Sequence, residues 1–382
     1  MTTMIDNEQK TLNVPNLRFP EFEGEWEKKR LGDFTERVKR KNKYNLSKLP
    51  LTISAKYGLV DQITFFNKIV ASTDMSNYYL LKKGEFAYNK SYSNDYPWGA
   101  IKRLDNYEQG VLSALYICFA TQDNVESDFI LQYFESPKWH KSVSKIAVEG
   151  ARNHGLLNIS VQDFFQTYHY VPKEKKEQTK IATLLHLIDE RISTQNKIIE
   201  KLETLIKGIA QSIAQGHKAN ILISECLGCS SSSLQESDVW EHGTYPVYGA
   251  NGIVGYLDNY NTENEAIYII KDGSGVGSTS YVTGKCSATG TLNILRAKEG
   301  YSLQYLYYML KVFNFEPYKT GMAIPHIYFK DYGKAKVFCP TYKEQLQYAR
   351  LLSAIDKRLT VEHGLLTSLS LQKQYLLRQM FI

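Results

Sequence analysis

The sequence predicts an α+β protein with two β-rich α/β globular domains, separated by a long antiparallel two-helix coiled coil and related by a pseudo-two-fold internal repeat. Three observations predict this fold: the chain length, a duplicated 15-residue segment, and the apolar heptads that follow each copy of it. At 382 residues, the chain can form two domains of ordinary size, each with its own core. A hydrophobic fraction of 43% and a charged fraction of 23% are typical of a folded, soluble protein.

The internal repeat sets the organisation of the chain. Residues 177–191 read EQTKIATLLHLIDER, and residues 344–358 read EQLQYARLLSAIDKR. The copies lie 167 residues apart without a gap and are identical at eight of 15 positions, where chance would give about one. The match continues upstream in an aspartate and a proline nine residues apart: Asp163 and Pro172, then Asp331 and Pro340. We therefore expect a first globular domain, a central helix, a second globular domain and a C-terminal helix, over residues 1–172, 173–217, 218–340 and 341–382.

Each copy of the repeat continues into a long helix with an apolar seam. Apolar residues recur at alternating four- and three-residue steps for more than four heptads, which is the coiled-coil pattern. Polar residues at Gln195, Glu362 and Lys373 interrupt the seam and can set its register. The alternative is that each helix packs separately on its own domain. The seam is expected to include Ile188, Ile192, Ile199, Leu202 and Ile209, paired with Ile355, Leu359, Leu366, Leu369 and Leu376.

A duplicated unit can pair with itself about a pseudo-two-fold axis, and the two seams then run antiparallel. At about 1.5 Å per residue, the stretch from Ile181 to Ile213 forms a rod of roughly 50 Å. Domains held at the two ends of such a rod would meet a DNA duplex about one to one and a half helical turns apart.

Both globular segments show short strand patterns separated by turn residues, each followed by a helical stretch. Their sequences are barely similar away from the long helices. In the first segment we expect strands at 79–81, 85–88 and 110–119 and a helix at 129–134. In the second we expect strands at 245–248, 266–270 and 291–295 and a helix at 302–306.

Composition limits the function classes. The net charge of +6 permits an anionic partner, and the 28 tyrosines, many near Lys, Arg or Asn, suit contacts to DNA grooves and backbone, although most tyrosines are expected to fill half-buried strands. The five cysteines are scattered, as in reduced proteins, and the pair Cys226 and Cys229 lacks the partners that would complete a zinc site. Neither a signal peptide nor an apolar run of about 18 residues occurs, so we expect a cytoplasmic protein without a membrane span.

Motifs that suggest catalysis are incomplete. The glycines of Gly273–Gly277 follow a predicted strand and could hold S-adenosylmethionine, but the sequence after them predicts a strand and a turn instead of a helix. The segment Phe313–Tyr318 resembles an adenine-methyltransferase motif without its proline pair, and it lies too close to these glycines for the intervening βα units. No phosphate-binding loop or histidine triad is complete, so we expect neither a catalytic residue nor a metal site.

The ordered set of motifs resembles the specificity subunit of type I restriction–modification systems over nearly the whole chain. The resemblance rests on the two junctions of a proline with an EQ-x8-ID-x-R helix, and on three loop sequences: YPVYGANG at 245–252, IIKDGSG at 269–275 and the looser LKKGEFAYNK at 81–90. It implies that each globular segment is a target-recognition domain for one half of a bipartite DNA site. It also implies that the helices bind two methyltransferase subunits, which restriction (motor) subunits join. On this resemblance the chain binds no cofactor itself, and the partner subunits use S-adenosylmethionine, ATP and Mg.

Candidate DNA-binding residues follow from loop position and chemistry. A basic run in the first domain could follow phosphates, or could be an ordinary solvated loop: Arg37, Lys39, Arg40, Lys41, Lys43 and Tyr44. Two further polar stretches there suit base edges: Lys90, Ser91, Tyr92, Asn94 and Trp98, and then Arg152, Asn153 and His154. The candidates in the second domain are Tyr248, Asn251, Lys271, Ser274, Ser278, Lys319, Thr320 and His326.

Three other functions remain open on the sequence. The specificity subunit of a related system with fused cleavage and methylation functions would be distinguished by its neighbouring genes. A coiled-coil adaptor that binds protein would lack salt-dependent binding to duplex DNA. A self-contained DNA methyltransferase would transfer methyl groups as the purified chain alone.

Overall fold

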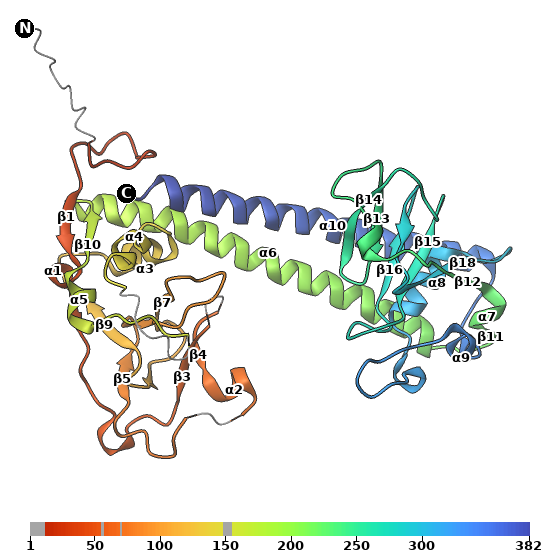
Figure 1. Cartoon of the computed structure of the whole chain (residues 1–382), viewed down its shortest axis with the longest axis horizontal. Coiled ribbons are helices and arrows are strands. Elements are labelled where there is room, and N and C mark those ends of the chain that lie inside the picture. The colour runs from red at the N-terminus through yellow and green to blue at the C-terminus, as the bar shows by residue number, and fades with distance from the viewer. Residues whose placement is uncertain (1–11, 55–56, 69–70, 148–154) are drawn as a thin grey trace, which may run out of the picture. The chain divides into compact units, whose positions relative to one another are not determined.

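The computed structural model describes the chain except residues 1–11, 55–56, 69–70 and 148–154 (Figure 1). The chain divides into two compact units. Unit 1 contains Met1–Ser193 and Thr367–Ile382, and unit 2 contains Thr194–Leu366. Each unit therefore combines one globular segment with a part of both long helices. No helix in the described part of the chain combines the length and apolarity needed to cross a bilayer.

Unit 1 is built on a four-stranded antiparallel sheet of order β2-β9-β6-β7, flanked by the strand pairs β1-β10, β3-β4 and β5-β8. Its strands are β1 Glu27–Arg30, β2 Thr35–Arg37, β3 Leu51–Ser54, β4 Gly58–Asp61, β5 Tyr79–Lys82, β6 Phe86–Asn89, β7 Ala100–Arg103, β8 Gln109–Leu112, β9 Ile117–Thr121 and β10 Tyr168–Val171. Its short helices are α1 Leu31–Phe34, α2 Gln62–Phe66, α3 Ser127–Glu135, α4 His140–Ser144 and α5 Val161–Gln166, with a 3-10 turn at Lys43–Asn45.

The expected single strand over residues 110–119 is wrong. This stretch forms β8 and β9, which belong to different sheets. The Tyr116 amide donates to the Ser113 carbonyl at 3.3 Å and closes a turn between the two strands. The apolar run is continuous because both strands are buried, so its hydrophobicity did not reveal the turn.

Unit 2 has a four-stranded antiparallel sheet of order β12-β18-β15-β16 and a smaller sheet of order β14-β13-β17. Its strands are β11 Ile221–Leu222, β12 Leu227–Ser231, β13 Tyr245–Gly249, β14 Gly252–Leu257, β15 Ala266–Ile270, β16 Thr279–Val282, β17 Ser287–Ala288, β18 Leu292–Ala297 and β19 Lys336–Val337. Its short helices are α7 Ile223–Cys226, α8 Leu303–Lys311 and α9 Phe329–Tyr332, with 3-10 turns at Glu236–Asp238 and Glu316–Tyr318.

The duplication is visible in the fold. The succession β1-α1-β2 in unit 1 corresponds to β11-α7-β12 in unit 2, and α5-β10 corresponds to α9-β19. The four-stranded sheets have the same order, because β2, β9, β6 and β7 take the places of β12, β18, β15 and β16. In both units a nine-residue helix, α3 or α8, follows the second strand of that order. Two segments with little sequence similarity therefore share one architecture.

The glutamine of the repeated EQ motif helps to explain why the two units share one architecture. Gln178 is buried, accepts a hydrogen bond from the Glu126 amide before α3 at 2.8 Å, and donates to the Pro172 carbonyl at 2.8 Å. Gln345 repeats this arrangement with the Ser302 amide before α8 and the Pro340 carbonyl, both at 2.9 Å. One side chain thus joins the start of a long helix to the globular segment in each unit.

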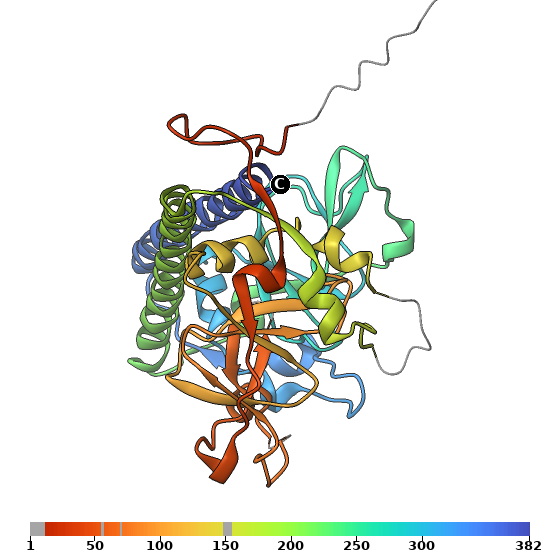
Figure 2. The same cartoon turned by 90° about the vertical axis from the view of Figure 1, so that its left-hand side faces the viewer.

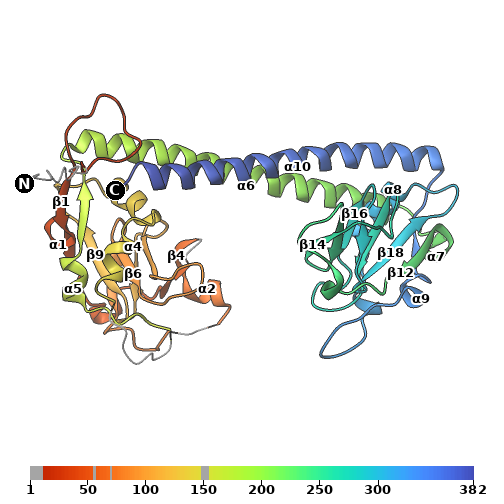
Figure 3. The ribbon, with the colours of Figure 1, turned by 45° about the horizontal axis from the view of Figure 1, so that its top comes forward.

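The two long helices, α6 Lys175–Gln215 and α10 Tyr342–Gln379, lie side by side (Figures 1 and 3). In unit 1, Leu185 near the start of α6 shares a core with Phe381, just after the end of α10. In unit 2, Ile213 near the end of α6 shares a core with Leu352 near the start of α10. The helices are therefore antiparallel in each unit, as the repeat predicts, and separate packing on the two domains is wrong.

All ten expected seam residues are buried or half-buried. The polar seam positions are paired. Lys373 donates to Asp189 at 2.5 Å in unit 1, and in unit 2 Gln195 donates to the Glu362 carbonyl at 3.0 Å and to its carboxylate. Gln195 and Glu362 are 167 residues apart, which is the offset of the repeat.

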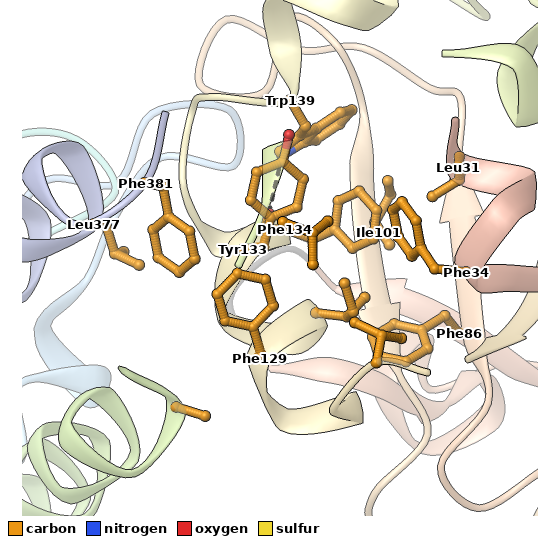
Figure 4. Packing of buried hydrophobic residues seen from close by; sticks show 14 of the residues in the cluster. Leu31, Phe34, Phe86, Ile101, Phe129, Tyr133, Phe134, Trp139, Leu377 and Phe381 are labelled. Carbon is orange, nitrogen blue, oxygen red and sulfur yellow. Dashed lines mark hydrogen bonds between the residues drawn. The ribbon is translucent and has the colours of Figure 1, made fainter. Parts of the chain in front are cut away.

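Aromatic side chains fill the core of unit 1 (Figure 4). Phe86 and Phe119, which face each other on the neighbouring strands β6 and β9, stack with their ring centroids 5.2 Å apart. Phe381 packs against Phe129 of α3 at 5.4 Å, and Leu377 of α10 joins the same cluster. The end of α10 thus completes a core made by the first globular segment, and Figure 2 shows this end beside the start of α6.

Candidate nucleic-acid interface

Some cations of the basic run in the first segment form contacts within the protein, and others do not. Arg40 forms two hydrogen bonds with the Glu85 carboxylate, at 2.9 and 3.1 Å, which raise the pKa of its guanidinium. Arg37 donates to the Tyr79 hydroxyl at 3.1 Å. Lys41 donates to the Asn77 carbonyl at 2.9 Å and lies 3.8 Å above the ring of Tyr79. These three cations stabilise the segment itself.

Lys39 and Lys43 differ from their neighbours. Both are exposed, and neither forms a hydrogen bond or ion pair with any residue that the structure describes. The adjacent Tyr44 is 94% exposed in a left-handed backbone conformation. Of the predicted run, these three residues remain available to DNA phosphates and sugars.

We expect the double substitution Lys39→Ala and Lys43→Ala to lower the slope of log K against log salt by about 2 for binding to a random-sequence duplex, since each phosphate contact contributes about 0.9. The measurement is fluorescence anisotropy of the full chain over a salt series. Arg40→Ala is the matched control: it should leave the slope unchanged and lower the unfolding temperature. Equal slopes for the double variant and the parent chain would contradict the assignment.

The polar loop after β6 is only partly available. Lys90 donates to the Ile159 carbonyl at 3.3 Å, and burial lowers the pKa of its ammonium. Trp98 packs on the core, and its carbonyl accepts from the Tyr88 hydroxyl at 2.8 Å. Tyr92 and Asn94 are exposed, as is Ser91, which pairs with Leu156. The predicted residues Arg152, Asn153 and His154 lie outside the described residues.

In the second segment, two loops far apart in the sequence come together. The loop between β15 and β16 carries Lys271, Ser274 and Ser278, and the other loop carries Lys319, Thr320 and His326. The His326 ring contacts the Asp272 carboxylate at 2.6 Å, and the Gly273 amide donates to the Pro325 carbonyl at 3.0 Å. Six of the eight predicted residues of this segment therefore belong to one loop cluster.

A cavity of about 440 Å³ opens beside this cluster. Its polar lining includes Ser278, Lys311, Asn314 and Lys319. Glu316 also lines it and binds Lys319 at 2.6 Å, so one lysine charge is already balanced. Hydroxyl, amide and ammonium donors around one hollow suit a phosphate or a base edge.

Tyr248 and Asn251 lie on the smaller sheet, away from the loop cluster in the topology. Tyr248 is half-buried, its ring centroid lies 5.8 Å from that of Tyr268, and burial raises the pKa of its hydroxyl. Asn251 is exposed between β13 and β14. The Thr289 amide donates to the Tyr248 carbonyl at 2.9 Å, and the Lys271 amide to the Thr291 carbonyl at 3.0 Å, so a short turn connects the two regions. DNA contacts by these residues stay a prediction.

Sequence reasoning missed several residues of this surface. Lys311 ends α8 and reaches the cavity only through the packing of that helix. Met322 and Ile324 are exposed apolar residues in the middle of the second loop. Spacing gave no signal for them, because their positions depend on contacts between distant segments.

The glycines of Gly273–Gly277 do not begin a helix. They connect β15 to β16 in an antiparallel hairpin, as the sequence indicated. Burial raises the pKa of the Cys226 thiol to about 12 and that of Cys229 to about 11, so both are neutral thiols at physiological pH. Within the described part of the chain, no group of three or more His, Cys, Asp or Glu side chains has the geometry of a metal site.

Comparison with known proteins finds sequences similar to this chain. Residues 228–371 match the family model of the type I restriction modification DNA specificity domain. A type I restriction enzyme specificity subunit of Escherichia coli is 26% identical over 112 residues, which cover 29% of this chain but only 28% of that relative's length. A putative type I specificity subunit of Mycoplasma genitalium is 23% identical over 282 residues, which cover 68% of this chain and 72% of the relative.

Solved structures agree in fold. The crystal structure of the type I restriction–modification S subunit from M. genitalium aligns with a TM-score of 0.64 at 18% identity, over 97% of this chain and 99% of that one. A chain from a structure of type I system assembly and conformational transition aligns with a TM-score of 0.54 at 16% identity, over 93% and 97% of the two chains. The chain is therefore similar in fold and in part of its sequence to type I restriction–modification specificity subunits, and the match to the DNA specificity domain lies at residues 228–371.

Proposed function

We propose that the chain is the DNA sequence-specificity subunit of a type I restriction–modification complex, in which each globular segment recognises one half of a bipartite DNA site. The duplicated architecture carries this proposal: both units have the same four-stranded sheet order, while the sequences on it differ. A shared scaffold with unlike loops suits two recognition domains with different target sequences. The names of the relatives support the same function.

The long helices are proposed to bind the methyltransferase subunits. In each unit they expose large apolar side chains beside the seam: Leu187, Leu371 and Tyr375 in unit 1, and Leu205, Leu351, Val361 and Leu365 in unit 2. Exposed apolar residues on an otherwise polar helix surface suit protein contacts. The pseudo-two-fold repeat suggests two methyltransferase subunits, with restriction subunits joining the core. We propose that these partners supply S-adenosylmethionine, ATP and Mg chemistry in the cytoplasm, without catalysis or a cofactor site on this chain.

The decisive experiment is methylome sequencing of cells with and without the gene. We expect a bipartite methylated motif that disappears when the gene is deleted and returns with the parent chain. Complementation with Arg152→Ala or Asn153→Ala should relax one half of the motif, and Lys271→Ala the other half. Loss of both halves from the Arg152 change would contradict the assignment of one half-site to each segment.

The exposed apolar residues on the helices also suit a protein-binding adaptor without DNA recognition. In that case the methylome would not change with the gene, and binding to duplex DNA would not depend on salt. Methyl transfer by the purified chain alone would instead support a self-contained methyltransferase.

A further inference from the structure

The loop of residues 319–326 in unit 2 is a hairpin with an exposed apolar tip. Met322 is fully exposed, more than any other large hydrophobic side chain in the described part of the chain, and Ile324 is 57% exposed. Single exposed hydrophobic residues are common on protein surfaces and carry no meaning alone. The contacts that fix the base of this hairpin, and its tight turn, show why the exposed tip is of interest.

Four contacts fix the base of the hairpin. The Thr320 amide donates to the His326 carbonyl at 2.9 Å, and the His326 amide donates back at 2.7 Å. The Gly273 amide and the Asp272 carboxylate bind Pro325 and His326 from the neighbouring loop, at 3.0 and 2.6 Å. Because the base is already ordered, binding through the tip costs little additional conformational entropy.

The turn itself keeps the apolar side chains away from the domain. Gly321 has a φ of +86°, and a Cβ atom at this position would lie 2.4 Å from the Ile324 carbonyl oxygen. Only glycine fits this turn without strain. Pro325 adds a fixed φ on the other side of the tip. The exposure of Met322 is therefore a consequence of a tight turn and anchored ends.

We propose that this tip is a wedge that inserts Met322 between neighbouring base pairs of the DNA bound by unit 2. The inference rests on the proposed DNA-recognition function. Two side chains form too small a surface for a stable protein interface, which buries about 1,200 Å² or more. An apolar side chain between base steps needs only this area, and such wedges partly unstack and kink the duplex.

The surroundings of the tip favour DNA as the occupant. The contacting loop carries Lys271 and the exposed Ser274, and Lys319, which is paired with Glu316, lies at one end of the hairpin. These groups suit phosphate and sugar contacts on either side of an opened step. The nearby Asp272 carboxylate is already engaged by the His326 ring, which it contacts at 2.6 Å.

The test uses the complex recovered through an affinity tag on the full chain, with a duplex that carries the mapped motif. The fluorescent adenine analogue 2-aminopurine is placed in turn at each step of the half-site that unit 2 recognises. We expect the parent complex to increase the fluorescence several-fold at one step, because unstacking relieves quenching. Met322→Ser should abolish the increase and weaken binding about tenfold.

Further variants separate insertion from general disturbance. Met322→Leu should retain the signal, and Gly321→Ala, which strains the turn, should lose it. Leu115→Ser is the matched control, since Leu115 is 63% exposed on unit 1 and should not affect this half-site. A mismatch at the opened step should restore the affinity of Met322→Ser, because its bases are already less stacked.

Two results would overturn the wedge: specific binding by the parent complex without a fluorescence change at any step of this half-site, or identical behaviour of Met322→Ser and the parent. Failure of the proposed function gives a different result, namely no sequence-specific retention of the duplex by any variant.

Discussion

Replacing Glu177 with alanine is expected to lower the free energy of unfolding by about 3 kcal/mol, because it breaks a largely buried ion pair and leaves the Trp26 indole without its acceptor. Glu177 is 2% exposed and accepts two hydrogen bonds from Arg18, at 2.7 and 2.8 Å. It also accepts one from the indole of the buried Trp26 at 3.1 Å. The hydrogen bond to Glu177 raises the pKa of the Arg18 guanidinium.

The repeat provides the matched control for this prediction. Glu344 occupies the same motif position but is exposed, and it accepts hydrogen bonds from the Thr341 amide and hydroxyl at 3.0 and 2.6 Å. Glu344→Ala removes only this local contact at the start of α10 and should cost several-fold less. Urea denaturation followed by circular dichroism measures both variants. Equal losses would show that the ion pair around Glu177 adds nothing to stability.

The second large effect is expected at the centre of the seam. Gln195→Glu places a second carboxylate beside Glu362, where both side chains are almost fully buried. Like charges at this distance raise the pKa of one carboxyl group, and its charge opposes folding at neutral pH. We expect an unfolding temperature lower by about 4 °C or more at pH 7, since about 1 kcal/mol corresponds to a few degrees in a chain of this size.

The pH dependence distinguishes this effect from simple loss of a hydrogen bond. In the parent chain, the hydrogen bond from Gln195 lowers the pKa of Glu362, so its stabilisation is present above the unfolded value of 4.5 and is lost as the pH falls through the lowered pKa. In Gln195→Glu the shared site has a raised pKa, so stability increases as the pH falls towards 4.5. The difference in unfolding temperature between the two proteins should therefore shrink on acidification.

A double substitution tests whether the pair follows the repeat. Gln195→Glu with Glu362→Gln exchanges the two side chains across the pseudo-two-fold axis. Arg358, which binds Glu362 four residues later in α10, has the repeat equivalent Arg191 four residues before position 195. We expect the exchanged protein to recover most of the lost stability at pH 7. Gln372→Glu, on an exposed position of α10, controls for added charge. No recovery in the exchanged protein would contradict the symmetric arrangement.

The parts of the fold that depend on local periodicity could be predicted from the sequence. The heptads predicted which residues form the seam, because burial along a helix follows residue spacing directly, and the repeat predicted that the seam is antiparallel. The roles within the EQ motif could not be predicted. Gln178 and Gln345 bind amides 52 and 43 residues away, and Glu177 binds an arginine 159 residues away. Such partners become visible only when distant segments are packed.

The candidate site also contains features that could be predicted from the sequence and features that could not. Sequence chemistry selected Lys271 and His326, and the fold brought their loops together. It also selected Arg40, although that guanidinium is bound to Glu85, 45 residues away. A run of cations in the sequence does not reveal which charges are balanced within the protein. The apolar tip at Met322 was missed for the opposite reason, since a hydrophobic residue is assigned to the core by default.

The division of both long helices between the units has a consequence for biosynthesis. The ribosome completes residues 1–193 first, yet Phe129 and Tyr133 meet Phe381 only after all of unit 2 has been translated. Until then, unit 1 presents an open aromatic surface, which is the kind of surface that promotes aggregation of nascent chains. The earliest segment to leave the ribosome is therefore among the last to finish folding.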